Sequence, residues 1–321
     1  MRKHFDPKIK KKNPNSIYNY LYGSKSEKSF ERYIRGNFCI VCGNNIEVDI
    51  SKLKGNEFLE TTYSSIPEKE RSIIALRDNL TQFKEEDVTY RVNRLGIRTS
   101  GIDLVKDYVN TLMVGCSFTF GEGLPYKMTW PYLISNKYNC SFENLGFPGA
   151  SISRIARILT TILPIKNPER VIVLFPSHGR QELFTTITTP LPGDNSSFDT
   201  INYSPGYPHT VSSYQKICLD YEQCVKSSHI DTVDMYKNFH IIKLLADNLG
   251  IELIVSSWDL DVHEKLYDVF DESQIAAHFH YLAQDKKNDK ARDGMHPGEN
   301  PNIVFAANIE YCINGNKKNS L

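Results

Sequence analysis

The sequence has no long apolar run and no excess of charge of either sign. No stretch among its 321 residues is long and apolar enough to span a bilayer, and the chain begins with charged residues instead of the apolar core of a signal peptide. Lys and Arg together number 38, as do Asp and Glu, so the net charge favours neither nucleic acid nor an anionic membrane. We expect a protein that is cytoplasmic, or released by a route other than a cleaved signal peptide, with no nucleic-acid or membrane partner.

The seven cysteines are odd in number and irregularly spaced, which does not fit a disulfide framework. The run Cys39-Ile-Val-Cys42 resembles half of a zinc knuckle, but a structural zinc site needs four ligands and there is no second Cys-x-x-Cys. Cys218 and Cys224 could complete a site, although their flanks do not resemble a knuckle. Residues 278–280, His-Phe-His, offer another ligand pair, whose alternation better fits one face of a short strand or helix end. We predict no metal and no cofactor.

The composition is that of a globular protein. Hydrophobic residues make up 40% and charged residues 24% of the chain, enough for one domain with a sizeable core and an additional segment. Lys, Asn, Ile and Tyr are frequent, which indicates an AT-rich genome and fits bacterial and viral sources equally well.

Three regions can be distinguished along the chain. Residues 1–14 are basic and proline-containing, which predicts a disordered tail. Residues 15–105 are polar, with a helix predicted near 66–86, and form an N-terminal extension packed on the core. Residues 106–321 form the main domain. Within it, 184–228 lack clear periodicity, which predicts a long loop or lid that selects the substrate.

From residue 111 onward, apolar strands alternate with helical patterns. This alternation predicts an α/β fold with a parallel sheet covered by helices on both faces. The predicted strands lie near 111–115, 142–145, 170–175 and 251–257, and the predicted helices near 129–138, 151–163, 232–249 and 299–312.

Ser117 is the candidate nucleophile. The run Leu112–Val114 is typical of a buried strand, and Gly115 and Gly121 bracket a turn that holds the serine hydroxyl clear of the sheet edge. A serine hydroxyl needs an adjacent base, and the base needs a third group to orient it. Asp293 and His296 supply such a pair.

Asp293 and His296 are expected to point the same way because they lie three residues apart on a helical turn. The carboxylate can then hold one imidazole nitrogen while the other nitrogen faces Ser117.

Three segments resemble the sequence blocks of the SGNH (GDSL-type) hydrolase superfamily. Gly115–Gly121 resembles the first block, with Cys116 where the family usually has Asp. Asn144–Ser151 resembles the second block, in which Gly149 best matches the glycine whose N–H lines the oxyanion hole. Asp293–Pro297 resembles the last block, Asp-x-x-His. The resemblance implies a flavodoxin-like three-layer α/β sandwich and a serine hydrolase.

A further segment, Asn93-Arg-Leu-Gly-Ile-Arg98, resembles the Asn-x-x-Gly-x-Arg sequence that leads into the catalytic domain of some SGNH-like proteins.

The third block departs from the family, which usually ends this strand with Gly-x-Asn-Asp and uses the Asn amide as an oxyanion donor. Here Val171–Phe175 continues into a segment without asparagine. Ser177 or His178 could donate the missing hydrogen bond. Arg180 could bind negative charge on the substrate or pair with Glu182. Loss of one oxyanion donor slows a reaction about a hundred- to a thousandfold, so the departure fits a slow enzyme or a different donor.

These residues predict an esterase. His296 would remove the proton of Ser117, and the N–H groups of Ser117 and Gly149, with Ser177 or His178, would hold the oxyanion. The expected substrate is a small-molecule or carbohydrate ester. Four tyrosines of the insertion would suit stacking on sugar rings and favour an O-acetylated carbohydrate: Tyr203, Tyr207, Tyr214 and Tyr221.

The alternative is an SGNH-like binding or structural protein, for example of a virion, with weak or no turnover. The altered third block and the long N-terminal extension favour this interpretation, whereas the retained Ser117, Asp293 and His296 oppose it.

Overall fold

The computed structural model describes residues 40–42, 46–48, 59–63, 66–78, 80–93, 97–98, 109–185, 199–205, 212–280 and 289–318. Three features singled out in the sequence lie outside these residues: the predicted basic tail, Cys39 and Tyr207. The side chain of Tyr214 lies outside them as well.

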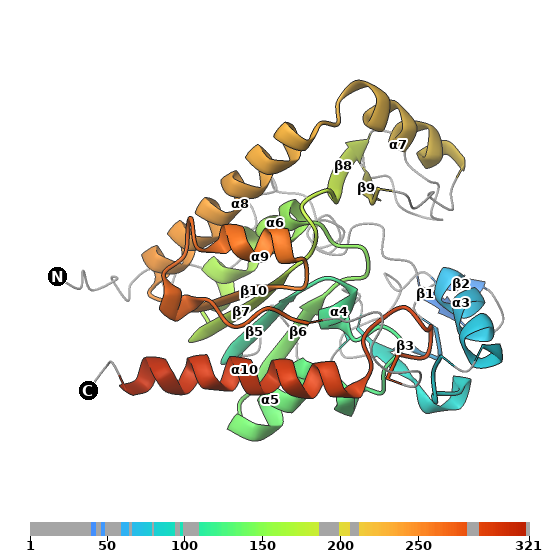
Figure 1. Ribbon diagram of the computed structural model, residues 1–321, viewed down its shortest axis with the longest axis horizontal. Helices are drawn as coiled ribbons and strands as arrows, with labels where there is room; N and C mark the ends of the chain where they lie inside the picture. Colours follow the sequence, from blue (N-terminus) through green and yellow to red (C-terminus); the bar gives the residue numbers. More distant parts are fainter. Residues whose placement is uncertain are drawn as a thin grey trace.

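A parallel sheet of four strands forms the centre of the fold, with the neighbour order β10-β7-β5-β6 (Figure 1). The strands are β5 (Thr111–Gly115), β6 (Phe142–Gly146), β7 (Arg170–Phe175) and β10 (Glu252–Ser257). Parallel strands covered on both faces appear as continuous apolar runs, and the side chains of Leu112–Val114 and Val171–Phe175 are all buried. Counted from the β6 edge, neighbouring strands are the second, first, third and fourth of the sheet in chain order, as in flavodoxin-like folds.

Helices cover both faces of this sheet. On one face α6 (Ile152–Lys166) packs against α8 (Ser228–Leu249), and on the other α5 (Trp130–Tyr138) packs against α10 (Glu299–Lys318) (Figure 1). α9 (Leu260–Leu266) follows β10. The predicted three-layer α/β sandwich is thereby confirmed. Among the described helices, none has the length and apolar character needed to cross a membrane.

Three of these helices are longer than the sequence pattern predicts; α6 ends three residues later than expected, at Lys166. α8 begins four residues earlier than expected, at Ser228, because the Ser227 hydroxyl caps it by accepting a hydrogen bond from the N–H of Ile230 at 3.2 Å. α10 continues to Lys318 and passes through Gly315, since a single glycine costs a helix only about 1 kcal/mol.

The helix predicted near 66–86 is shorter than expected. α3 covers Ile66–Arg77, after which the chain turns and the Thr81 hydroxyl donates to the carbonyl of Lys290 at 3.0 Å. This contact with a distant segment overrides the local helical pattern. The other short elements of this region and the connecting 3-10 turns are β1 (Ile40–Cys42), β2 (Ile46–Val48), β3 (Leu59–Thr61), η3 (Glu85–Asp87), β4 (Tyr90–Val92), η4 (Tyr126–Met128) and η5 (Glu272–Gln274).

The prediction of a long loop at 184–228 is wrong for the parts of this segment that the structure describes, which contain strands and a helix. β8 (Gln181–Thr185) pairs antiparallel with β9 (Asp199–Tyr203), and α7 (Ser212–Cys224) precedes α8. The Leu-Phe-Thr sequence of β8 has the aromatic and β-branched residues that favour a strand, whereas α7 is more polar on average than α8 and α10, which makes its helical pattern less evident.

Two glycines allow the short helix α4 (Ser117–Phe120) to lie directly on the end of the sheet. A Cβ atom on Gly146 would lie 2.2 Å from the backbone nitrogen of Phe120, and one on Gly115 would lie 2.1 Å from Oγ1 of Thr119. The Asn144 amide also donates to the Thr119 carbonyl at 2.8 Å. Ser117, the first residue of α4, can therefore take its position only because Gly115 and Gly146 lack side chains.

We predict that Gly146→Ala destabilises the protein by about 1–3 kcal/mol, because the new methyl group meets backbone that cannot move away cheaply. Gly315→Ala is the matched control: it lies within α10, no atom lies within 4 Å of the added methyl group, and it should stabilise by about 0.4–1 kcal/mol. Urea unfolding measures both. Equal effects of the two substitutions would contradict the close-packing argument.

Candidate active site

Ser117 occupies the first residue of α4, directly after β5 and Cys116. The helix ends after one turn at Gly121, whose φ of 77° is in the left-handed region and whose N–H donates to the Ser117 carbonyl at 2.9 Å. Ser117 is buried, so its hydroxyl lies at a sharp strand-to-helix turn at the edge where β5, β6 and β7 all end.

The hydroxyl of Ser117 belongs to a continuous hydrogen-bonded chain. Oγ of Ser117 lies 2.8 Å from Nε2 of His296, and Nδ1 of His296 lies 2.7 Å from Oδ2 of Asp293. A carboxylate on Nδ1 sets the tautomer in which Nε2 can accept a proton. The two sequence motifs thus meet although Ser117 and His296 lie 179 positions apart.

The Asp293–His296 segment is not the helical turn that the sequence spacing predicts. Gly294 adopts a left-handed φ of 69°, and Oδ1 of Asp293 accepts hydrogen bonds from the N–H groups of Met295 and His296, both at 3.1 Å. An aspartate side chain commonly holds a turn by bonding backbone just ahead of it. One carboxylate oxygen therefore shapes the turn while the other faces the imidazole.

Arg71 and Glu122 complete this cluster, and sequence reasoning missed both. Nη2 of Arg71 lies 2.8 Å from Oε1 of Glu122 and 3.1 Å from Oδ2 of Asp293, to which Nε also donates at 3.2 Å. Oε2 of Glu122 lies 3.8 Å from Nε2 of His296. Glu122 lies only five positions after Ser117, between two glycines, which is a signal that could have been used. Arg71, on α3, has no such signal.

Burial and charge act in opposite directions on these groups. Burial lowers the pKa of His296, but the negative charges of Asp293 and Glu122 outweigh it and raise this pKa above its ordinary value. Burial would raise the pKa of Asp293, yet the charge and hydrogen bonds of His296, with the charge of Arg71, hold it well below its usual range. Burial raises the pKa of Glu122. The net result is an imidazole that is a stronger base than free histidine.

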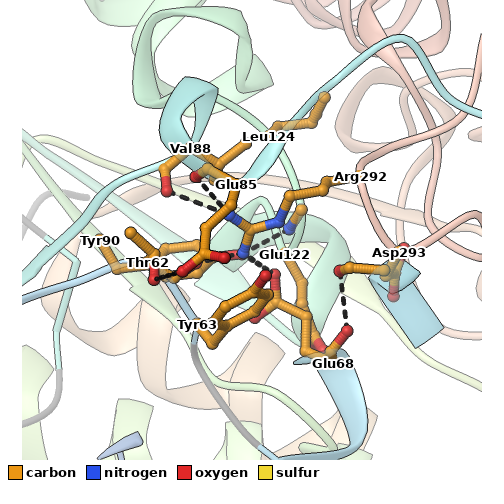
Figure 2. A network of polar contacts seen from close by, with 12 residues as sticks. Thr62, Tyr63, Glu68, Glu85, Val88, Tyr90, Glu122, Leu124, Arg292 and Asp293 are labelled. Atoms are coloured by element: carbon orange, nitrogen blue, oxygen red, sulfur yellow. Dashed lines mark hydrogen bonds and ion pairs between the residues drawn. The ribbon is translucent and has the colours of Figure 1, made fainter. Parts of the chain in front are cut away.

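A buried arginine anchors Asp293 to the N-terminal part of the chain (Figure 2). The guanidinium of Arg292 donates to Oε1 of Glu68 at 2.6 Å and to the carbonyls of Val88 at 3.2 Å and Glu85 at 3.0 Å, and it also donates to the Thr62 carbonyl. Both side chains of the Arg292–Glu68 pair are fully buried. The backbone position of the neighbouring Asp293 is therefore tied to these distant segments.

The same N-terminal part holds the loop after Ser117. The Tyr90 hydroxyl donates to Glu68 at 2.6 Å and accepts from the N–H of Gly123 at 2.6 Å. Arg98, the last residue of the Asn-x-x-Gly-x-Arg sequence, donates to the carbonyls of Gly121 and Leu124, both at 2.7 Å. The serine loop and the Asp–His loop are thus held by one buried polar network.

The residues predicted to form the oxyanion hole lie on the loops at the same sheet edge. Gly149, with a φ of 75°, is on the loop after β6. Ser177 and His178 are partly buried on the segment after β7, where Nδ1 of His178 lies 3.5 Å from Oδ2 of Asp261. Since β5, β6 and β7 are parallel and in register, their following loops share one edge with Ser117.

Arg180 does not pair with Glu182, one of the two roles that the sequence left open for it. Glu182 instead forms a bidentate ion pair with Arg157, at 2.6 and 2.7 Å. The Arg180 guanidinium lies 5.2 Å from the centre of the Trp258 ring. Trp258 stacks on Phe118, the residue after the serine, at 5.1 Å between ring centres.

Of the four tyrosines expected to stack on sugar rings, the structure describes the side chains of Tyr203 and Tyr221, and Tyr203 is not available for stacking. Tyr203 is buried against Tyr221, with 5.2 Å between ring centres, and its hydroxyl accepts from Lys226 at 3.2 Å. Its ring faces are used within the protein.

Two groups of side chains could be considered for a metal. Glu122, Asp293 and His296 offer ligand atoms within 4.8 Å of one another, but the Arg71 guanidinium already contacts both carboxylates and supplies positive charge there. Nδ1 atoms of His278 and His280 lie 3.4 Å apart, which is hydrogen-bonding distance for two imidazoles.

No protein-family model and no curated protein sequence matches the chain. Among solved structures, the psychrotrophic esterase EstA from Pseudoalteromonas sp., inhibited by monoethylphosphonate, matches with a TM-score of 0.39 and 14% identity over 64% of this chain and 97% of its own. A protein assigned to the lipolytic G-D-S-L family from Desulfitobacterium hafniense DCB-2 matches with a TM-score of 0.36 and 11% identity over 63% and 98%. The description of the second of these proteins names the G-D-S-L family, whose sequence blocks this chain resembles. Both matches are distant, so what the site can do follows from its own side chains.

We predict that Glu68→Ala costs about 3–5 kcal/mol of stability, because it leaves the Arg292 guanidinium buried without its carboxylate. Glu70→Ala, at an exposed position of the same helix, should change stability by less than about 0.5 kcal/mol. The double variant Glu68→Leu with Arg292→Met removes both charges but leaves the carbonyls of Thr62, Glu85 and Val88 without the Arg292 donors, so it should recover only part of the loss. Urea unfolding compares the four proteins, and a Glu68→Ala protein as stable as the Glu70→Ala control would contradict the role given to the buried pair.

Proposed function

We propose that the protein is a serine esterase that cleaves a small ester through an acyl-enzyme, with Ser117 as nucleophile, His296 as general base and Asp293 as the group that orients the imidazole. The observation that carries the proposal is the hydrogen-bonded chain from Ser117 Oγ through His296 to Asp293, at 2.8 and 2.7 Å. Nucleophile, base and orienting group in this order are the working parts of a serine hydrolase.

The reaction proceeds in two halves. Nε2 of His296 takes the proton from Ser117 as Oγ bonds to the ester carbonyl carbon. The tetrahedral intermediate then collapses, the bond to the alcohol breaks and His296 returns the proton to the departing oxygen. Water, deprotonated by the same imidazole, then attacks the acyl-enzyme. The bond between the acyl carbon and Ser117 Oγ breaks, His296 returns the proton to Oγ, and the acid is released. Asp293 stays ionised throughout and stabilises the imidazolium.

The oxyanion of the intermediate would be held by the N–H groups of Ser117 and Gly149. Ser117 begins a helix with no side-chain cap, and the first N–H groups of a helix have no acceptor within it. Ser177 or His178 would add the donor that the usual asparagine supplies in the SGNH superfamily. Arg180, on the face of Trp258, would contact the substrate beyond the reacting carbonyl.

We predict that Ser117→Ala lowers kcat for p-nitrophenyl acetate by about 10⁴- to 10⁶-fold, since it removes the nucleophile on which the whole chain acts. A fluorophosphonate probe should add its mass to the peptide containing Ser117. The exposed Ser228→Ala variant is the control and should keep full activity and labelling. A parent protein that neither hydrolyses any ester nor labels would favour the alternative of an SGNH-like binding or structural protein.

The effects on kcat and KM distinguish the proposed oxyanion donors, Ser177 and His178, from the proposed substrate-binding residue, Arg180. We predict that Ser177→Ala or His178→Ala lowers kcat about a hundredfold with KM nearly unchanged, because an oxyanion donor acts mainly in the transition state. Arg180→Ala should instead raise KM. If the Ser177 and His178 variants both keep kcat within about twofold of the parent, neither residue is the missing donor.

A further inference from the structure

The imidazole of His296 lies between two carboxylates, although a serine hydrolase needs only one. Asp293 contacts Nδ1 at 2.7 Å, and Oε2 of Glu122 lies 3.8 Å from Nε2, the nitrogen that faces Ser117. Arg71 joins both carboxylates, at 3.1 Å and 2.8 Å. The proposed mechanism assigns no role to Glu122 or to Arg71.

We propose that Glu122 and Arg71 are positioning residues for His296: Glu122 is a second carboxylate that stabilises the imidazolium from the Nε2 side, and Arg71 locks both carboxylates in place and limits their combined charge. The inference rests on the proposed function, because the imidazolium forms only when His296 acts as a base.

Glu122 has little freedom to be anywhere else. Its N–H donates to the Ser117 carbonyl at 3.1 Å. Its neighbours Gly121 and Gly123 have left-handed φ values of 77° and 78°, and a Cβ on either would meet atoms of other segments at 2.2 and 2.9 Å. The backbone of Gly123 is further held by Tyr90. The second carboxylate is thus fixed with respect to the nucleophile that it accompanies.

Arg71 reaches the site from α3. Its guanidinium and Nδ1 of His296 both contact Oδ2 of Asp293. One oxygen atom therefore orients the imidazole and also binds the arginine of α3. About a quarter of the Arg71 side chain is exposed, whereas Glu122 and Asp293 are nearly or fully buried. The guanidinium therefore closes the solvent side of the carboxylate pair.

The charges of the cluster favour the step that the mechanism requires. With neutral His296, the two carboxylates and Arg71 sum to one negative charge. When His296 takes the Ser117 proton the sum becomes zero. Fixed charges arranged to suit the charge that develops in the transition state lower its energy. The charged groups that face His296 are Asp293, Glu122 and Arg71, with Glu68 acting on the latter two.

Glu122 and Arg71 carry opposite charges, so removing each should shift the His296 titration in opposite directions. A merely structural role of the two residues would not produce such opposite shifts. Removing the Glu122 charge disfavours protonated His296, so Glu122→Gln should move the titration of His296 to lower pH. Removing the Arg71 charge favours protonation, so Arg71→Met should move it to higher pH. The double variant should lie between the two, and Arg71→Lys, which keeps the charge, should stay closest to the parent.

The experiment measures the His296 imidazole by NMR titration, assigned with a His296→Asn protein, and in parallel the pH profile of kcat/KM with p-nitrophenyl acetate. Circular dichroism checks that each variant is folded. Arg77→Gln, an exposed arginine on the same helix, and Glu70→Gln are matched controls and should leave both curves unchanged. The acid limb of kcat/KM should follow the NMR midpoint, and kcat should fall about tenfold or more in Glu122→Gln.

Opposite shifts in Glu122→Gln and Arg71→Met support the inference. If folded Glu122→Gln, Arg71→Met and Arg71→Lys proteins all keep the parent midpoint, the inference is overturned, whether or not the parent cleaves esters. Opposite NMR shifts in a protein that neither hydrolyses esters nor labels at Ser117 would support the charge arrangement and refute the proposed function, so the two failures are distinguishable.

Discussion

Oδ2 of Asp293 is the atom at which the candidate site comes together. It accepts a hydrogen bond from the His296 imidazole and two from Arg71, while the other oxygen of the same carboxylate holds the turn that carries His296. An ionised carboxylate has about four acceptor positions, and most of them are used here. Asp293 is fully buried, so each of these bonds acts in a medium in which an unpaired charge would be costly. Loss of this carboxylate would disturb the base, the turn and the N-terminal helix together.

Buried arginines hold the loops around the site in a similar way. Arg292 and Arg98 donate most of their hydrogen bonds to backbone carbonyls of loops. Glu68 accepts from both Arg292 and Tyr90, and the Tyr90 ring lies against the Arg98 guanidinium. Loops are ordinarily the mobile parts of an α/β fold. Here the serine loop and the Asp–His loop are fixed against each other by a network contributed mainly by residues before 100, which act as part of the site although they carry neither nucleophile nor base.

The sequence predicted the parts of this arrangement that local pattern encodes. The central strands appeared as continuous apolar runs, and Ser117, Asp293 and His296 were singled out by spacing and by resemblance to SGNH blocks; the structure brings these three side chains together, and their catalytic role remains a proposal. Arg71 could not be predicted, because its partner Asp293 lies 222 positions away and an arginine on a polar helix resembles any surface residue. The shortened helix α3 has a similar cause, because a contact with the distant Lys290 overrides its local pattern, whereas the turn at Gly294 is held locally by the Asp293 side chain. The helix found within 184–228 was missed because it is more polar on average than α8 and α10, which were predicted.

The long separation between these partners also bears on how the protein is made. Contacts between residues far apart in sequence form late, because closing a long loop costs conformational entropy before any contact repays it. Ser117 meets His296 across 179 positions, and Arg71 meets Asp293 across 222. During translation, the N-terminal segment and Ser117 leave the ribosome well before residue 296 is synthesised, so the growing chain carries Ser117 without its hydrogen-bond partner. The cluster around Oδ2 of Asp293 is therefore completed only after the Asp293–His296 segment has been made and has docked onto α3 and the loop of Ser117.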